Sequence, residues 1–184
     1  MLKIKEKRPD AIFEAFSNSA PYYMTYSGCV AGNHDRKSDN LRPECYGEFA
    51  DYLIDVCRHY KDEYGIEFRT LEPFNEPMTD YWFAGGEQEG CHFDVGSQID
   101  FLKVLAPKLR ESGLSTTVAV SDETSVNQSV LDFIAYRDAG VLDMVGQWNT
   151  HSYTADDFSR AKLSSLCNEA SIRCLLYTST SPRD

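Results

Sequence analysis

The sequence predicts an α/β fold in which helices cover a parallel sheet. Short apolar runs alternate with segments whose apolar residues recur at helical spacing. Polar and aromatic residues follow four of the predicted strands, and the opposite strand ends carry nothing comparable. This asymmetry is typical of a (β/α)8 barrel, where the loops after the strands form the site. Eight strands need roughly 250 residues, so the 184 residues present predict one domain that is a partial barrel of about four β/α units.

The predicted elements follow one another as strand and helix along the chain. After a short helical end at residues 1–8, the predicted strands are residues 11–16, 66–71, 116–120 and 142–148. The predicted helices are residues 44–64, about 96–112, a segment from Val126 to Gly140, and about 155–170. Gly65 is expected to end the first of these long helices as its C′ residue. Pro107 is expected to kink or interrupt the second.

Charge and composition exclude several classes of partner. The net charge is -11, which disfavours binding to nucleic acid or to anionic membranes, because basic patches supply the affinity there. Aromatic residues make up 12% of the chain and include eleven tyrosines, which suits stacking on ring-shaped ligands. No apolar run approaches the length of a membrane span, and the N-terminus lacks the apolar region of a secretory signal.

The cysteines and histidines give no metal-binding pattern. The six cysteines include no C-x-x-C pair. Cys57 lies on the apolar face of a predicted helix and is expected to be a small core residue. The sequence does not decide whether a disulfide forms among Cys29, Cys45 and Cys91. The histidines form no H-x-H or H-E-x-x-H pair, which disfavours a metal-dependent hydrolase; they are His34, His59, His92 and His151. No metal or cofactor is expected.

The stretch 71–77, Leu-Glu-Pro-Phe-Asn-Glu-Pro, organises the rest of the chain. It ends a predicted strand and presents the Asn75 amide and the Glu76 carboxyl group. Pro77 has no N–H to continue a sheet, and it is expected to hold Glu76 in an extended conformation. For these three residues alone, a surface loop that happens to carry a glutamate is the competing interpretation.

Four segments in chain order carry a resemblance to a known family. They are residues 15–24 (AFSNSAPYYM), 72–77 (EPFNEP), 88–91 (QEGC) and 149–153 (NTHSY). Together they resemble glycoside hydrolase family 30, a group within the clan of retaining (β/α)8 glycosidases, and most closely its endo-β-1,6-galactanase-like subgroup. The resemblance covers about residues 1–173. It implies that the chain holds barrel strands 3 to 6 and that its partner is a β-linked polysaccharide, most directly β-1,6-galactan.

The resemblance assigns roles at two strand ends. Glu76 corresponds to the general acid/base, and Asn75 to the residue that binds the 2-hydroxyl of the sugar. Tyr153, together with His151, corresponds to the residues beside the nucleophile that orient it. Retaining hydrolysis needs one protonated and one ionised carboxyl group. The acid is therefore expected to have a pKa raised by partial burial or by a neighbouring negative charge.

Further residues are implied as the walls of the sugar site. Asn18 and Tyr23 would line the innermost subsite, and Trp82 would be a stacking platform for a sugar ring. Asp122 and Glu123 end a predicted strand and would face the pocket. A carbohydrate-binding protein without catalysis is the alternative function, which the aromatic loops permit.

The nucleophile that the family places on the next strand has no counterpart in the sequence. That strand should begin near Ile172, yet no acidic residue follows until Asp184, and Glu169 lies in the preceding helix. Residues 174–184 are similar to the translation of a transposase-type sequencing adapter, with an unrelated natural C-terminus as the alternative. The expected organisation is thus a catalytic-domain fragment, residues 1–173, followed by a non-native tail, and the fragment is expected to be inactive.

Overall fold

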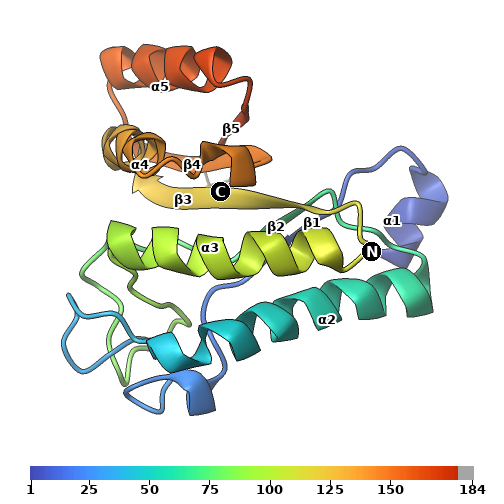
Figure 1. Cartoon of the computed structure of the whole chain (residues 1–184), viewed down its shortest axis with the longest axis horizontal. Coiled ribbons are helices and arrows are strands. Elements are labelled where there is room, and N and C mark those ends of the chain that lie inside the picture. The colour runs from blue at the N-terminus through green and yellow to red at the C-terminus, as the bar shows by residue number, and fades with distance from the viewer. Residues whose placement is uncertain (178–184) are drawn as a thin grey trace.

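A five-stranded parallel sheet forms the centre of the molecule. The computed structural model describes residues 1–177. The strands lie side by side in chain order, and every neighbouring pair is parallel (Figure 1). They are β1 (Glu14–Phe16), β2 (Thr70–Glu72), β3 (Thr117–Ser125), β4 (Gln147–Thr154) and β5 (Arg173–Tyr177). The predicted parallel α/β sheet is confirmed.

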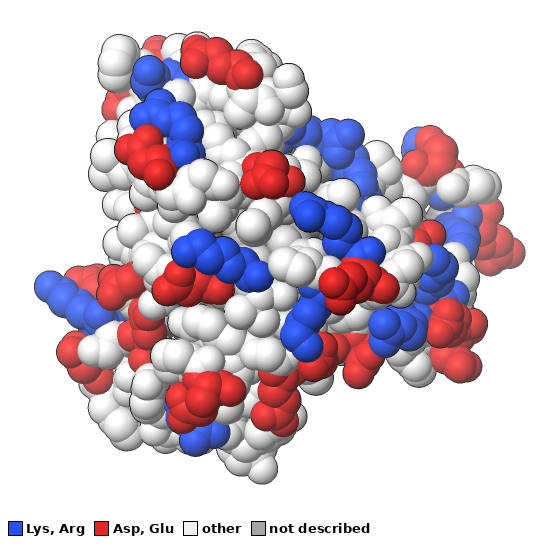
Figure 2. Space-filling model, viewed as in Figure 1, with Lys and Arg blue, Asp and Glu red and all other residues white. Residues whose placement is uncertain are grey.

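Helices connect the strands and cover one face of the sheet, except for the first helix, which precedes β1. They are α1 (Leu2–Lys7), α2 (Tyr46–Tyr64), α3 (Val95–Glu111), α4 (Val126–Asp138) and α5 (Asp157–Glu169). In the view of Figure 1, α2 and α3 lie side by side below β3, and α4 and α5 lie above it. Within residues 1–177, no helix combines the length and apolar character that crossing a bilayer requires. On the face drawn in Figure 2, acidic and basic side chains alternate over the surface.

Helix α2 shows how local sequence sets the element bounds. A 3-10 turn, Pro43–Cys45, leads into the helix, and Phe49, Leu53 and Cys57 lie buried along one side. Gly65 ends the helix with φ 59°, the left-handed conformation that glycine adopts without steric cost. The predicted end of this helix at Gly65 and the core position of Cys57 are confirmed, while the α-helix begins at Tyr46, two residues later than predicted.

Several elements differ from the prediction in their bounds. The expected strand 66–71 is reduced to β2, because the Ile66 N–H bonds back to the Tyr60 carbonyl at the end of α2. The expected strand 142–148 begins later, because a 3-10 turn occupies Leu142–Met144. Helix α3 continues through Pro107 to Glu111, so the proline does not interrupt it. The first strand is likewise shorter than residues 11–16.

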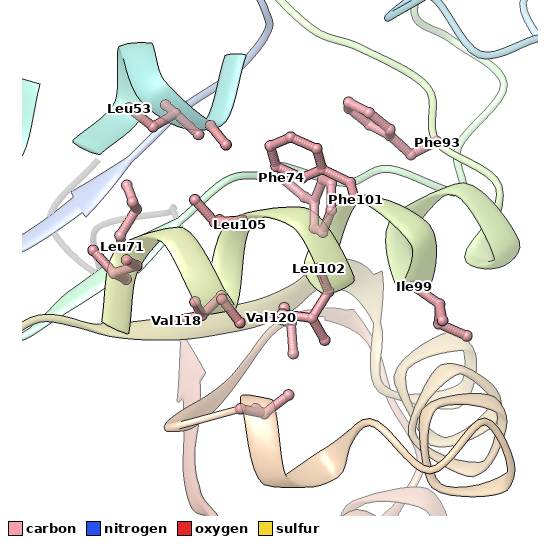
Figure 3. Packing of buried hydrophobic residues seen from close by; sticks show 14 of the residues in the cluster. Leu53, Leu71, Phe74, Phe93, Ile99, Phe101, Leu102, Leu105, Val118 and Val120 are labelled. Carbon is pink, nitrogen blue, oxygen red and sulfur yellow. The ribbon is translucent and has the colours of Figure 1, made fainter. Parts of the chain in front are cut away.

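The apolar core lies between the sheet and the helices. Leu71 of β2 and Val118 and Val120 of β3 point toward α3, where Leu102 and Leu105 meet them (Figure 3). Side chains alternate between the two faces of a strand. The residues between these apolar positions therefore face the opposite, concave side of the sheet, where the site is found.

Candidate active site

A cavity of about 830 Å³ lies at the carboxyl ends of the strands. Five of the residues predicted for the site line it: Asn18, Asn75, Glu76, His151 and Tyr153. They come from segments that follow β1 and β2 and from β4 itself. Residues up to 135 positions apart in sequence therefore meet where the parallel-sheet argument places a site.

The backbone of Glu76 is held in a left-handed conformation with φ 49°, so the expected extended conformation is wrong. Pro77 does disfavour a right-handed helical conformation for the residue before it. The choice between the remaining conformations is made by tertiary hydrogen bonds. The Glu76 N–H donates to the Asp122 carbonyl at 2.9 Å, and the Trp82 indole N–H donates to the Glu76 carbonyl at 3.0 Å.

The Glu76 carboxyl group is buried and is held from both sides. Its Oε1 lies 2.9 Å from His151 Nδ1, and its Oε2 accepts a hydrogen bond from the Tyr81 hydroxyl. The other ring nitrogen, Nε2 of His151, lies 3.3 Å from Oδ1 of the fully buried Asp122. The imidazole thus bridges two carboxylates, one in the loop after β2 and one on β3, and only 7% of Glu76 is exposed.

This arrangement sets the charge of the site. Burial favours the neutral imidazole, but the hydrogen bonds and charges of Asp122 and Glu76 outweigh it and raise the pKa of His151 to about 9. Burial would likewise raise the pKa of Glu76, but the hydrogen bonds from His151 and Tyr81 and the imidazolium charge lower it below its ordinary value. Glu76 is therefore ionised at neutral pH. The expected raised pKa is not found, because the strongest charged neighbour of Glu76 is a cation.

Asn75 and Tyr153 complete the wall near Glu76. Asn75 is 7% exposed, whereas Tyr153 is 43% exposed and turns its ring edge toward the ring of His151 at a centroid distance of 5.2 Å. An amide and a phenol near a carboxylate are groups that can orient sugar hydroxyls by hydrogen bonding.

Two predicted wall residues lie elsewhere. Trp82 is 3% exposed and absent from the cavity lining, because Gly90 packs so closely on the indole ring that a Cβ there would overlap it. The buried Trp82 ring has no free face on which a sugar could stack, unlike the predicted stacking platform. Its indole N–H instead supports the Glu76 backbone by a hydrogen bond. Tyr23 is half exposed and does not line the cavity either.

The two acidic residues of β3 divide between the faces of the sheet. Asp122 is directed to His151, as described above. Glu123 is buried on the other side with Asp132 and lies 3.5 Å from the Gln98 amide, so it does not face the pocket. Sequence reasoning missed Tyr81, because a single tyrosine in an aperiodic loop gives no signal, and it missed Glu72, the strand residue four positions before Glu76.

Replacing Tyr81 by phenylalanine is expected to destabilise the chain by about 1 kcal/mol and to raise the pKa of Glu76. The change removes one hydrogen bond to a carboxylate, discounted because Tyr81 is 41% exposed. Denaturant unfolding at pH 7 measures the loss. Tyr26→Phe, at another exposed tyrosine, is the control and should change stability little. Equal values for the two variants would contradict the assigned hydrogen bond.

A second polar cluster lies away from the cavity. Oxygen and nitrogen atoms of Asp39, His92 and Asp94 all lie within 4.8 Å of one another. Asp39 faces His92 Nδ1 at 3.0 Å and accepts the Asp94 backbone N–H at 2.7 Å, so hydrogen bonds within the chain account for the grouping. None of the three lines the cavity of Glu76.

Comparisons with known proteins match most of the chain to one family. The family model O-Glycosyl hydrolase family 30 matches residues 1–169. An endo-β-1,6-galactanase of Hypocrea rufa is 35% identical over 162 residues, which are 88% of this chain and 33% of that protein. An exo-β-1,6-galactobiohydrolase of Bifidobacterium longum is 28% identical over 183 residues, covering 77% of this chain and 12% of that protein.

Solved structures show the same fold. An endo-β-1,6-glucanase aligns with a TM-score of 0.78 and 20% identity, covering 95% of this chain and 38% of that structure. The catalytic domain of a family 30 xylanase C from Talaromyces cellulolyticus aligns with a TM-score of 0.72 and 18% identity, covering 96% and 49%.

The parallel β/α units and the solved structures that they align with define part of a (β/α)8 barrel, with a cavity at the carboxyl ends of its strands. The chain belongs to O-glycosyl hydrolase family 30. It spans a third of the length of the galactanase and about an eighth of the galactobiohydrolase.

Proposed function

We propose that this chain is the acid-bearing part of a retaining glycoside hydrolase that acts on β-1,6-linked galactan, and that it is inactive alone. The observation that carries the proposal is the placement of Glu76 at the carboxyl end of β2, held on the cavity wall by His151 and Tyr81. The names of the two curated relatives supply the substrate class.

The proposed chemistry needs a second carboxylate about 5–5.5 Å from Glu76. In the first step Glu76 would protonate the leaving oxygen while the second carboxylate attacks the sugar; in the second step Glu76 would take a proton from water. The family pattern puts the second group after α5. The strand there, β5, has no acidic residue, and residues 178–184 lie outside the described residues.

The ionised state of Glu76 fits a site that lacks its second carboxylate. A negative nucleophile nearby would raise the pKa of Glu76 and oppose the effect of the His151 imidazolium. With only the cation beside it, Glu76 holds no proton to donate at neutral pH. This is the physical reason for which the chain alone is proposed to be inactive.

The proposed boundary between native chain and tail falls at residue 174. Cys174–Tyr177 continue the sheet as the end of β5, in register with Trp148–His151 of β4. Strand pairing depends on side-chain pattern rather than on origin, so the adapter hypothesis remains a proposal. The nucleotide sequence tests it: codons for residues 174–184 that do not spell an adapter contradict it.

The experiment that tests the function compares this chain with the complete gene product. The 184-residue chain is expected to release no reducing sugar from β-1,6-galactan. In the complete enzyme, Glu76→Gln should lower kcat by about 10²–10⁴-fold, the usual contribution of a general acid. Glu87→Gln, in an exposed loop, is the matched control.

Two outcomes contradict parts of the proposal. Hydrolysis by the short chain would show that no second carboxylate is missing. Unchanged function of the complete Glu76→Gln protein would favour the alternative, a carbohydrate-binding protein without catalysis.

A further inference from the structure

We propose that Glu72 binds a hydroxyl group of the glycan at the floor of the cavity, as a residue that determines which sugar is accepted. The proposal rests on the function proposed above and deepens it. Glu72 is not part of the acid/base chemistry of Glu76, and it ends β2 four residues earlier in the chain.

The position of Glu72 is unusual for a glutamate. It is 2% exposed and lines the cavity, and within residues 1–177 neither of its carboxyl oxygens has a hydrogen-bond partner. Its neighbour Leu71 packs into the apolar core, so strand alternation directs Glu72 to the concave face. Buried polar groups are nearly always hydrogen-bonded in proteins, so each exception calls for an explanation, of which a functional role is one.

The surroundings determine which ligand chemistry fits. Burial, and next the negative charge of Asp122, raise the pKa of Glu72 well above its ordinary value and outweigh the opposing dipoles of the Phe74 backbone and the Asn149 amide. Glu72 is therefore a neutral acid with one O–H donor and free acceptor capacity. That combination matches an alcohol, which also donates and accepts.

Several polar groups at the floor of the cavity are engaged with one another. Glu14 accepts from Arg69 and, at 2.9 Å, from the Gln147 amide. The same Gln147 amide donates to the Asn149 side-chain oxygen at 2.8 Å. Glu14, Gln147 and the Asn149 oxygen are thus paired, whereas the carboxyl oxygens of Glu72 carry no hydrogen bond within residues 1–177 and are open to a ligand that enters the cavity.

A site built to bond a hydroxyl rejects a ligand that lacks it far more strongly than an apolar pocket rejects an extra group. Leaving the carboxyl group unpaired with a bound deoxy sugar keeps the full desolvation cost of burying it. Glu72 can therefore select the configuration of the sugar ring without touching the bond that is cut.

The test is calorimetric titration of the 184-residue chain with β-1,6-galactobiose. Glu72→Leu should weaken binding at least about tenfold without lowering the denaturation midpoint, because removing an unpaired buried carboxyl group costs no hydrogen bond. Glu72→Gln should bind within about threefold, since an amide also donates and accepts. Glu72→Met replaces the leucine variant if that variant does not fold.

Glu67→Gln is the matched control, because Glu67 lies before β2 and is paired with Lys61 and the Ser115 N–H. It should lower the midpoint and leave binding unchanged. Singly deoxygenated methyl β-galactosides then identify the hydroxyl. One of them should bind about tenfold more weakly than the parent sugar to the original chain, and the difference should vanish in Glu72→Leu.

The outcomes separate the two proposals. If the original chain binds galactobiose and Glu72→Leu binds it equally well, the role of Glu72 is overturned and the glycan function stands. If the original chain binds no galactobiose, the glycan function of this chain fails, and the role of Glu72 fails with it.

Discussion

His151→Phe is expected to destabilise the chain by about 3–5 kcal/mol at pH 7, as removal of one member of a buried ion pair does elsewhere. The imidazolium is the shared partner of Glu76 and Asp122, at 2.9 and 3.3 Å. Without it, two buried carboxylates face each other and the pKa of Glu76 should rise. Urea unfolding followed by circular dichroism measures the change in the free energy of unfolding.

The pH dependence of this variant provides an internal check. The destabilisation should shrink as the pH falls below about 4.5, because protonated carboxyl groups no longer repel one another. His34→Phe, at an exposed histidine, is the matched control and should shift stability by less than about 0.5 kcal/mol. A His151→Phe loss as small as that of the control would show that the imidazole does not hold the two carboxylates.

The original chain is expected to lose about 3 kcal/mol of stability between pH 6 and pH 9.5 through the titration of His151. The pKa of His151 is about 9 in the folded chain, against an ordinary 6.5. A raised folded pKa contributes stability that is complete below the unfolded pKa and is lost as the pH rises through the folded pKa. Unfolding free energies measured across this range show the loss.

The contribution of Glu76 to stability depends on pH in the opposite direction. The pKa of Glu76 is lowered in the folded chain, so its contribution is present above its ordinary 4.5 and is lost as the pH falls. The pair should stabilise the chain most between about pH 5 and pH 6.5, above the ordinary pKa of Glu76 and below that of His151. In His151→Phe the alkaline loss should disappear; an unchanged slope between pH 6 and 9.5 would assign it to another group.

The sequence predicted the order and type of the main elements, because apolar periodicity and glycine stops act locally. It also predicted Glu76, Asn75 and His151 in one cavity, because parallel strands place their carboxyl ends together. It could not predict the left-handed backbone of Glu76, which long-range bonds to Asp122 and Trp82 impose. Pattern alone gave the wrong conformation there.

The charge of the site was beyond sequence reasoning for a related reason. The pKa of a carboxyl group depends on which neighbour lies within hydrogen-bonding distance, and that neighbour, His151, is 75 residues away. Likewise an exposed stacking ring and a buried support cannot be told apart by residue type. Trp82 is a buried support, because Gly90 packs against its ring.

The spatial sequence of strands is identical to their order along the polypeptide, and this has a consequence for biogenesis. Each new strand can pair with the edge strand of the unit that was translated before it. The sheet can therefore assemble during synthesis from the amino end, whereas the contacts of Glu76 form after β3 and β4, which carry Asp122 and His151, have been made.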